Sequence, residues 1–563
     1  MYCISNGCFY GFALQAYTIV RNNYFNQGSA LLKMSYSLTM IHLRRIAALL
    51  FIAIFAPCLV KAQTKDHIPK QYDQQYRPQF HFTPAQNWTN DPNGLVYFNG
   101  EYHLFFQYNP FGHVWGHMSW GHAVSRDLVH WKQLSVALKE ADGVMIFSGS
   151  AVVDWNNTSG FGKNGKTPLV AIYTGYHPKS HLQDERIAYS LDNGRTWTKY
   201  SGNPVLNINS DNFRDPKVFW YQPDHHWIMI LALSDQHKVS FYSSNNLKNW
   251  THLSDFGPKA ATGGVWECPM LQPMEVDGNP HNIKWVLEVG LNPGSIAGGS
   301  GGQYFIGNFD GKKFTATQPT GSPGDSVLWV DYGKDFYAAT SWSDVPKSDG
   351  RTLWLGWLDN WQYGQKAPTS PWRGGMSVPR SVGLKTFPDG TRLVQNPVKE
   401  LQKLRYDHHH LSDITISGKN DELAQRGIRG DVLEIDAVFN LGSASEFGFL
   451  IRKGESQQTV AGYNVDHHQM YVDRTHSGAD SFSKDFPGVQ HGPLQPDDNT
   501  IRLHILVDRS SVEVFGNDGQ TVITDKIFPN LTSNGLQLFS KGGDVHVRSL
   551  DIWKLKSIWS RKP

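Results

Sequence analysis

A polar turn that closes on a tryptophan recurs three times along this chain, and it constrains the fold more than any other feature. Segments 125–127, 190–197 and 243–245 carry the turn, and they lead to Trp131, Trp197 and Trp250; the second segment reads as a complete Asp-box. The starts of these segments lie 65 and 53 residues apart. Such repeats are typical of β-propellers, in which each repeat forms one antiparallel sheet, and roughly 300 residues would hold about five of them.

Short apolar or alternating segments fill the chain from about His81 to Leu384. Segments 95–98, 102–106, 169–173 and 227–231 are examples, and no convincing amphipathic helix interrupts the series. Asn99-Gly100, Asp310-Gly311 and Asp389-Gly390 separate such segments and favour tight hairpin turns. The 53 glycines and the 13% aromatic content suit many short strands joined by turns.

The sequence changes character near Pro397. Segment 398–405 has helical character, and from Leu411 to Trp553 strands alternate cleanly, as in 501–507 and 511–515. Half-buried antiparallel strands of this kind build a β-sandwich. We therefore predict an all-β chain, with a five-bladed β-propeller over 63–396, a connector over 397–410 and a β-sandwich over 411–563.

Residues 1–62 read as an upstream segment and a signal peptide. Arg44 and Arg45 precede an apolar run of fifteen residues, which is short for a membrane span of about 20. Val60-Lys61-Ala62 supplies small residues for cleavage after Ala62, and Met40 or Met34 is the more plausible start. We expect export, to the outside or the periplasm, with no integral membrane span in the mature chain. A lipid-anchored alternative would use Cys58, whose preceding residues form a poor lipobox.

Charge and cysteine content exclude some classes of protein. The formal net charge of +2 gives no electrostatic basis for binding nucleic acid or an acidic membrane. After cleavage only Cys268 remains, so no intramolecular disulfide is possible and packing must stabilise the fold.

Three short motifs each contain one carboxylate among aromatic, proline and glycine residues. They are 88–94 with Asp91, 213–216 with Asp215 and 266–269 with Glu267. Such residues favour rigid turns that end strands and direct a side chain into a pocket. Three inward carboxylates with aromatic walls are what sugar-bond cleavage requires.

These motifs, together with segments 81–110, 147–150, 357–363 and 508–515, resemble glycoside hydrolase family 32, the β-fructosidases. The similarity covers nearly all of the mature chain, in order, and within the family it is greatest to bacterial levanases and exo-inulinases. The resemblance implies a five-bladed propeller followed by a sandwich.

The resemblance also implies roles for the acidic residues. Asp91 would be the nucleophile and Glu267 the acid/base, whose apolar sequence neighbours would keep its carboxyl group protonated. Asp215 would hold two sugar hydroxyls and stabilise the transition state, with Arg214 helping to keep it ionised. The structural alternatives are a turn cap for Asp91, a surface loop for Glu267 and a surface ion pair for Arg214 and Asp215.

By the same resemblance the sugar-binding residues are Asn90, Gln107, Trp115, Phe147, Ser148, Arg214 and Trp361. For Phe147 and Trp361 a packing role is nearly as plausible. Met270 stands where the family usually has aspartate, and Cys268 fits a buried small side chain better than a nucleophile.

Two other features suggest no chemistry. The histidines 408–410 fit a solvated surface better than a metal site, and the glycine-rich segment 298–302 lacks the lysine of a phosphate loop and fits a mobile loop near the pocket rim. No metal or organic cofactor is implied.

We interpret the chain as a secreted, retaining exo-β-fructosidase acting on levan, inulin and sucrose. An endo-levanase or a fructosyltransferase on the same scaffold is the alternative. A non-catalytic fructan-binding protein is a distant third possibility, because all three carboxylates are present. The sandwich could bind polysaccharide or brace the propeller, and bracing is favoured because no aromatic platform stands out there.

Overall fold

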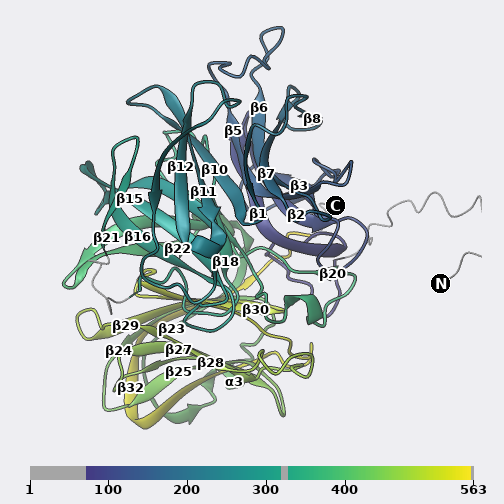
Figure 1. The fold of residues 1–563 in the computed structure, drawn as a ribbon. Coiled ribbons are helices and arrows are strands. Elements are labelled where there is room, and N and C mark those ends of the chain that lie inside the picture. The colour runs from purple at the N-terminus through teal and green to yellow at the C-terminus, as the bar shows by residue number, and fades with distance from the viewer. Residues whose placement is uncertain (1–71, 319–326, 560–563) are drawn as a thin grey trace, which may run out of the picture. The chain divides into compact units, whose positions relative to one another are not determined.

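The computed structural model describes residues 72–318 and 327–559, and strands form almost all of their regular structure (Figure 1). The helices in this part of the chain are short: α3 (Glu422–Gln425) and the 3-10 helices η1 (Ser234–Gln236), η2 (Gly364–Lys366) and η3 (Lys399–Leu404). The predicted all-β fold is thus confirmed. The expected signal peptide and Cys58 lie outside the described residues.

Three of the sheets before Pro397 each contain four or five strands. The first contains β1 (Asn87–Phe98), β2 (Glu101–Asn109), β3 (Ser119–Ser125), β4 (Trp131–Gln133) and β20 (Trp372–Arg373), which runs parallel to β1. The second contains β5 (Met145–Val153), β6 (Leu169–Tyr176), β7 (Gln183–Ser190), β8 (Thr198–Lys199) and β9 (Leu206–Ser210). The third contains β10 (Phe213–Tyr221), β11 (His226–Leu233), β12 (Lys238–Ser244) and β13 (Thr251–Phe256).

A fourth sheet consists of two antiparallel groups that share one residue pair. The first group is β14 (Val265–Val276), β15 (Asn279–Asn292), β16 (Gly301–Phe309) and β17 (Phe314–Gln318). The second is β18 (Tyr337–Ser341), β19 (Thr352–Trp357), β21 (Arg380–Phe387) and β22 (Gly390–Pro397). Val276 of β14 and Leu384 of β21 are the shared pair.

The repeated polar turn occupies equivalent places in three sheets. Ser125, Ser190 and Ser244 end β3, β7 and β12, and each hydroxyl accepts the backbone N–H of the residue two positions later. The third turn therefore starts one residue later than segment 243–245 predicted. In this turn Asn246 takes the position that aspartate holds in the other two turns, two residues after the serine. Its Oδ1 accepts the N–H of Asn249 at 3.0 Å.

Five strands with a common irregularity contact one another in a closed cycle. The order of contact is β1, β5, β10, β14, β18 and back to β1. Each breaks register with its antiparallel neighbour at a β-bulge, between Thr89/Pro92, Ile146/Gly149, Arg214/Lys217, Glu267/Met270 and Tyr337/Thr340. A bulge bends a strand and redirects its side chains, so these five positions can serve one site.

The strands after Arg405 form the predicted β-sandwich. They are β23 (Arg405–Asn420), β24 (Leu433–Asn440), β25 (Glu446–Lys453), β26 (Gln458–Asn464), β27 (Gln469–His476), β28 (Val489–Pro493), β29 (Thr500–Asp508), β30 (Ser511–Gly516), β31 (Thr521–Lys526) and β32 (Gly535–Leu555). The long strand β32 pairs with β25 through its first part and with β24 through its second, and β23 pairs with both parts, so both layers include β32. An aliphatic and aromatic core lies between the layers.

A buried ionic network joins the sandwich to the preceding sheets. His81 contacts Asp508 at 2.8 Å through Nδ1 and Glu513 at 2.9 Å through Nε2. Burial lowers the pKa of His81, but the two carboxylates raise it to about 9, so the ring is a cation. Arg380 donates to Glu513 at 2.8 Å and to Asp331 at 3.0 Å, and all these side chains are fully buried.

We expect Arg380→Ala to lower the free energy of unfolding by about 3–5 kcal/mol, because Asp331 and Glu513 would lose a buried cation. Denaturant unfolding followed by tryptophan fluorescence measures the change. Arg426→Ala is the matched control, since Arg426 pairs with Glu422 at the surface and should contribute less than about 1 kcal/mol. Equal losses in the two variants would contradict the assignment.

Candidate active site

One cavity of about 210 Å³ lies where the bulged strands meet, and it unites the residues predicted from the sequence. All ten of them line it: Asn90, Asp91, Gln107, Trp115, Phe147, Ser148, Arg214, Asp215, Glu267 and Trp361. Asn292, the last residue of β15, also lines the cavity and was not predicted. No motif in the sequence distinguishes Asn292, because it enters the cavity through strand pairing alone.

The three acidic motifs lie inside β1, β10 and β14 and not in turns at strand ends, so this part of the prediction is wrong. The bulges supply the kink that a turn was expected to give. Asp215 has φ 67° and Cys268 has φ 51°, both in the left-handed region. Pairing continues on either side of each bulge, so the strands fix the direction of each carboxyl group.

Asp91 is buried and accepts two hydrogen bonds. The Asn90 amide donates to Oδ1 at 3.0 Å, and the Ser148 hydroxyl donates to Oδ2 at 2.7 Å. The indole N–H of Trp88 donates to the Asn90 oxygen at 2.8 Å, which directs the amide nitrogen towards Asp91. Burial raises the pKa of Asp91, the two hydrogen bonds lower it, and the charge of Glu267 raises it again, with a net rise.

Asp215 is fixed through its backbone as well as its carboxyl group. Its N–H donates to the Thr174 hydroxyl at 2.9 Å, and its Oδ2 accepts the Cys268 backbone N–H at 3.0 Å. Burial is the main cause that raises the pKa of Asp215, and with the charges of Glu267 and Asp91 it brings the net value to about 7. Arg214 lowers this pKa as expected, but its Nε lies 3.9 Å from Oδ2 and does not offset burial.

Glu267 is 19% exposed at its side chain and has two polar partners. Arg214 Nη2 donates to Oε1 at 3.0 Å, and the Tyr337 hydroxyl donates to Oε2 at 2.5 Å. The sequence neighbours of Glu267 supply neither of these partners. The partners come from β10 and β18, which lie far from Glu267 in the sequence.

Tyr337 is a further residue that the sequence did not indicate. It is buried in β18, beside the bulge of that strand. Burial raises the pKa of Tyr337, and the charge of Glu267 raises it further, so its hydroxyl stays a donor. It belongs to no acidic motif, and only the contact between β14 and β18 brings it to Glu267.

Aromatic rings form the walls of the cavity. Trp115 is 36% exposed, and Phe147 stacks on Tyr176 with ring centroids 4.6 Å apart. Trp361 contacts Trp88 and Trp357, with centroids 5.8 and 5.0 Å away. Phe147 and Trp361 thus pack against other rings and also line the cavity, so the two roles considered for them coexist.

Cys268 lies between two of the carboxyl groups. Its Sγ is 3.7 Å from Asp91 Oδ2 and 3.6 Å from Asp215 Oδ2. Burial raises the pKa of the thiol, and the neighbouring carboxylates raise it further, which argues against a thiolate nucleophile. Met270, where the family usually has aspartate, is buried in an apolar cluster and does not line the cavity.

The other sequence features lie outside the cavity lining. The Asn360 amide donates to the carbonyls of Gly298 and Ser300, which ties down the glycine-rich segment. His408 and His410 on β23 both contact Asp551 at 2.8 Å and are about half exposed. In 72–318 and 327–559 no group of three metal-binding side chains is found, and no helix there has the length and apolar character to cross a membrane.

Comparison with known proteins covers both parts of the chain. Residues 81–397 match the N-terminal domain of glycosyl hydrolases family 32, and residues 400–554 match the C-terminal domain. A levanase of Bacillus subtilis (strain 168) is 52% identical over 497 residues, which cover 87% of this chain and 72% of the levanase.

Solved structures agree with these matches. The crystal structure of an exo-inulinase from Aspergillus awamori superposes with a TM-score of 0.82 at 44% identity, covering 87% of this chain and 100% of that one. The β-fructofuranosidase of Schwanniomyces occidentalis, complexed with fructosyl-erythritol, gives 0.78 at 33% identity over 86% and 99% of the two chains.

Three carboxyl groups in one small cavity, on a fold shared with these enzymes, define the protein as a glycoside hydrolase. Within that class, the chain belongs to glycosyl hydrolases family 32.

The raised pKa of Asp215 predicts a pH-dependent stability. Between pH 4 and 7 the folded protein keeps a proton that the unfolded chain has released, so stability falls as pH rises through this window. We expect the melting temperature of Asp215→Asn to fall less than that of the parent as the pH rises from about 4 to about 7.5, as melting curves would measure. Asp235→Asn, on the exposed turn of η1, should behave like the parent. Parallel losses in all three proteins would contradict the prediction.

Proposed function

We propose that the protein is a secreted, retaining exo-β-fructosidase that hydrolyses terminal β-D-fructofuranosyl bonds in levan, inulin and sucrose. The observation that carries the proposal is the cavity of about 210 Å³ that Asp91, Asp215 and Glu267 line together. The similarity to a levanase, an exo-inulinase and a β-fructofuranosidase supports the substrate class.

In this mechanism Glu267 protonates the glycosidic oxygen while Asp91 attacks the anomeric carbon. The bond to the leaving sugar breaks, and a covalent fructosyl-enzyme forms. Glu267 then takes a proton from water, which releases fructose with retained configuration and frees Asp91. Such an enzyme holds its two carboxyl groups about 5–5.5 Å apart. The donors from Asn90 and Ser148 support an ionised Asp91.

The remaining cavity residues would bind the sugar. Asp215 would accept two hydroxyl hydrogen bonds that strengthen as positive charge develops on the ring. Arg214 and Tyr337 would orient the Glu267 carboxyl group through the contacts that they make to its two oxygens. Asn90, Gln107, Ser148 and Asn292 offer polar contacts, and Trp115, Phe147 and Trp361 offer aromatic surface to the apolar face of the ring.

The size of the cavity supports action at chain ends. Pockets for drug-sized ligands occupy about 300–1,000 Å³, so 210 Å³ suits one sugar ring. An endo-acting enzyme needs an open cleft that admits internal residues of a polymer. The exo mode is therefore preferred over endo-levanase action on the same scaffold.

We also infer the finer architecture. The closed cycle β1–β5–β10–β14–β18 supports a five-bladed propeller, with the fourth sheet supplying two blades through its two strand groups. The proposed boundaries are 1–62 for the upstream segment and signal peptide, 63–396 for the propeller, 397–410 for the connector and 411–563 for the sandwich. The extracellular exo-inulinase of Aspergillus niger, 46% identical, supports export.

We expect Asp91→Asn and Glu267→Gln each to reduce fructose release from sucrose by at least about 10²-fold, because each removes a group that forms or breaks a bond. Steady-state hydrolysis measures the rate, and a melting curve confirms folding. Asp235→Asn serves as the control and should retain full activity. Parent-like activity in either folded active-site variant would disprove its assigned role.

We expect free fructose in the β configuration as the earliest product from levan and from inulin, because a pocket with room for one sugar ring selects terminal sugars and a double displacement retains configuration. NMR of the first product and chromatography over time measure these outcomes.

Other results point to the alternatives. Early accumulation of oligosaccharides with a rapid fall in polymer size would indicate endo action. Initial α-fructose would exclude the covalent mechanism. Glucose in clear excess over fructose, with sucrose as substrate, would indicate a fructosyltransferase.

A further inference from the structure

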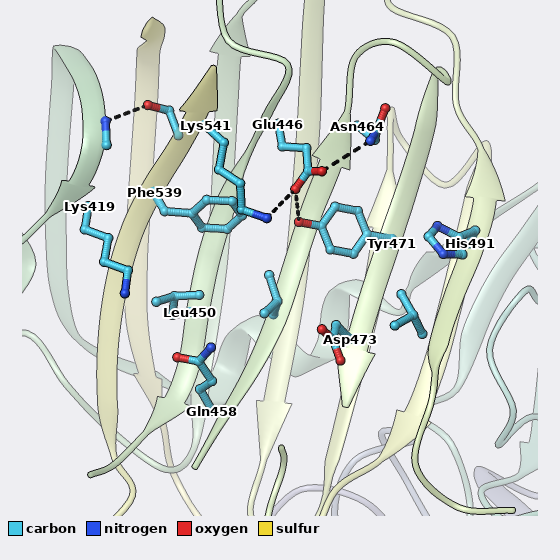
Figure 2. Close-up of a pocket in the computed structure, with 14 residues that line it drawn as sticks. Lys419, Glu446, Leu450, Gln458, Asn464, Tyr471, Asp473, His491, Phe539 and Lys541 are labelled. Atoms are coloured by element: carbon cyan, nitrogen blue, oxygen red, sulfur yellow. Dashed lines mark hydrogen bonds and ion pairs between the residues drawn. The ribbon is translucent and has the colours of Figure 1, made fainter. Parts of the chain in front are cut away.

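A second concavity of about 660 Å³ lies on the sandwich, and none of its lining residues belongs to the catalytic cavity (Figure 2). It crosses neighbouring strands in the order β28, β27, β26, β25 and β32. It occupies the outer face of this sheet, because the alternate residues of the same strands, such as Phe447, Tyr463 and Val472, belong to the sandwich core.

The side chains of Phe539 and Tyr471 lie at the floor of this groove, where they are 4% and 7% exposed. Phe539 pairs with Gly448, Gly448 with Gly462, and Gly462 with Tyr471, so two glycines separate the two aromatic residues across four strands. A Cβ at Gly462 would lie 2.9 Å from the Tyr471 ring, which shows that the ring lies directly over the glycine. Figure 2 shows the two rings side by side in the middle of the view, with the amine of Lys541 between them. Leu450, which is 5% exposed, packs in the same buried cluster, so only a small part of each ring reaches the groove.

Hydrogen-bonding groups surround the aromatic floor. Glu446 accepts hydrogen bonds from Lys541 at 2.7 Å, from the Tyr471 hydroxyl at 3.2 Å and from Asn464 at 3.4 Å. Asp473 and Gln458 lie on the opposite side of the two rings (Figure 2). The donors and acceptors are therefore arranged on both edges of an apolar strip.

The charges of the groove balance. Lys419 and Lys541 face Glu446 and Asp473, so two cations and two anions line the same surface. A balanced set gives no field that would concentrate a charged polymer. A neutral ligand rich in hydroxyl groups fits this lining, because its oxygens can use the polar edges and it brings no charge of its own.

We propose that this groove binds a neutral sugar chain, namely a segment of the fructan whose ends are cleaved in the catalytic cavity. The inference rests on the proposed function for the identity of the polymer. The groove is about three times larger than the catalytic cavity, 660 against 210 Å³, so it has room for several linked sugar rings. Binding there would hold the enzyme on the polymer, whereas sucrose is too short to use it.

The first test measures binding without cleavage, in the Glu267→Gln background. Glu446→Ala combined with Lys541→Ala removes both partners of the ion pair, so no charge loses its partner. We expect the dissociation constant for levan or inulin, from affinity electrophoresis, to rise about tenfold, as expected for two lost hydrogen-bonding groups. Lys484→Ala, an exposed lysine outside the groove, is the matched control and should bind like its parent.

A second variant guards against loss of folding. Tyr471→Phe removes only the hydroxyl group that contacts Glu446, and we expect it to weaken polymer binding by several-fold with an unchanged melting temperature. Unchanged polymer affinity in the folded groove variants would overturn the proposal. Equally strong retention of the parent by dextran sulfate would also overturn it, because the groove would then not select a neutral chain.

The third measurement separates this inference from the proposed function. In the active enzyme, the groove variants should lower kcat/KM for the polymer several-fold and leave kcat/KM for sucrose within about twofold, since the loss concerns polymer binding alone. An equal loss of kcat/KM on both substrates would overturn the proposal that the groove binds the polymer. Failure of the parent enzyme to release fructose from sucrose would instead disprove the proposed function.

Discussion

Three carboxyl groups share one small cavity with a single guanidinium group. Holding like charges together in a buried site is unfavourable, and the N-terminal part of the protein supplies the donors that offset it. Burial raises the pKa of Asp91 and Asp215, the charge of Glu267 raises both further, and the charge of Asp91 adds to the rise for Asp215. The opposing donors are Asn90, Ser148 and the backbone N–H of Cys268. They come from three different strands, so the carboxyl groups keep their positions only if the strands are held rigidly together.

The sandwich contributes to that rigidity. Segment 508–515, first noted only for its similarity to the family, contains the two carboxylates that contact His81 near the start of the described chain. Arg380, in β21, contacts one of them as well. Buried ion pairs add little net stability but tolerate few alternative geometries. The network therefore fixes the sandwich to the sheets that carry the site, while the opposite face of the sandwich stays available for a ligand.

The sequence indicated most of the site but misjudged how it is built. All ten predicted residues line one cavity. The three acidic motifs contain the carboxylates, Asn90 and Arg214, and the family resemblance supplied Gln107, Trp115, Phe147, Ser148 and Trp361. The proline and glycine residues in these motifs suggested turns, yet they lie in bulged strands, and a bulge needs the same backbone freedom as a turn. Tyr337 and Asn292 could not be predicted, because packing of β18 on β14 brings Tyr337 to Glu267 and strand pairing brings Asn292 to the cavity.

The sequence by itself determined the all-β fold, the sandwich and the identity of the three carboxylates, since alternation, turn dipeptides and compact motifs are local signals. Only the tertiary structure decided which groups contact Glu267 and which side chains line the groove on the sandwich. Tyr471 and Phe539 are distant in the sequence and meet only through the register of four strands around two glycines. Register depends on long-range pairing, and the local pattern of residues does not specify which distant side chains it brings together.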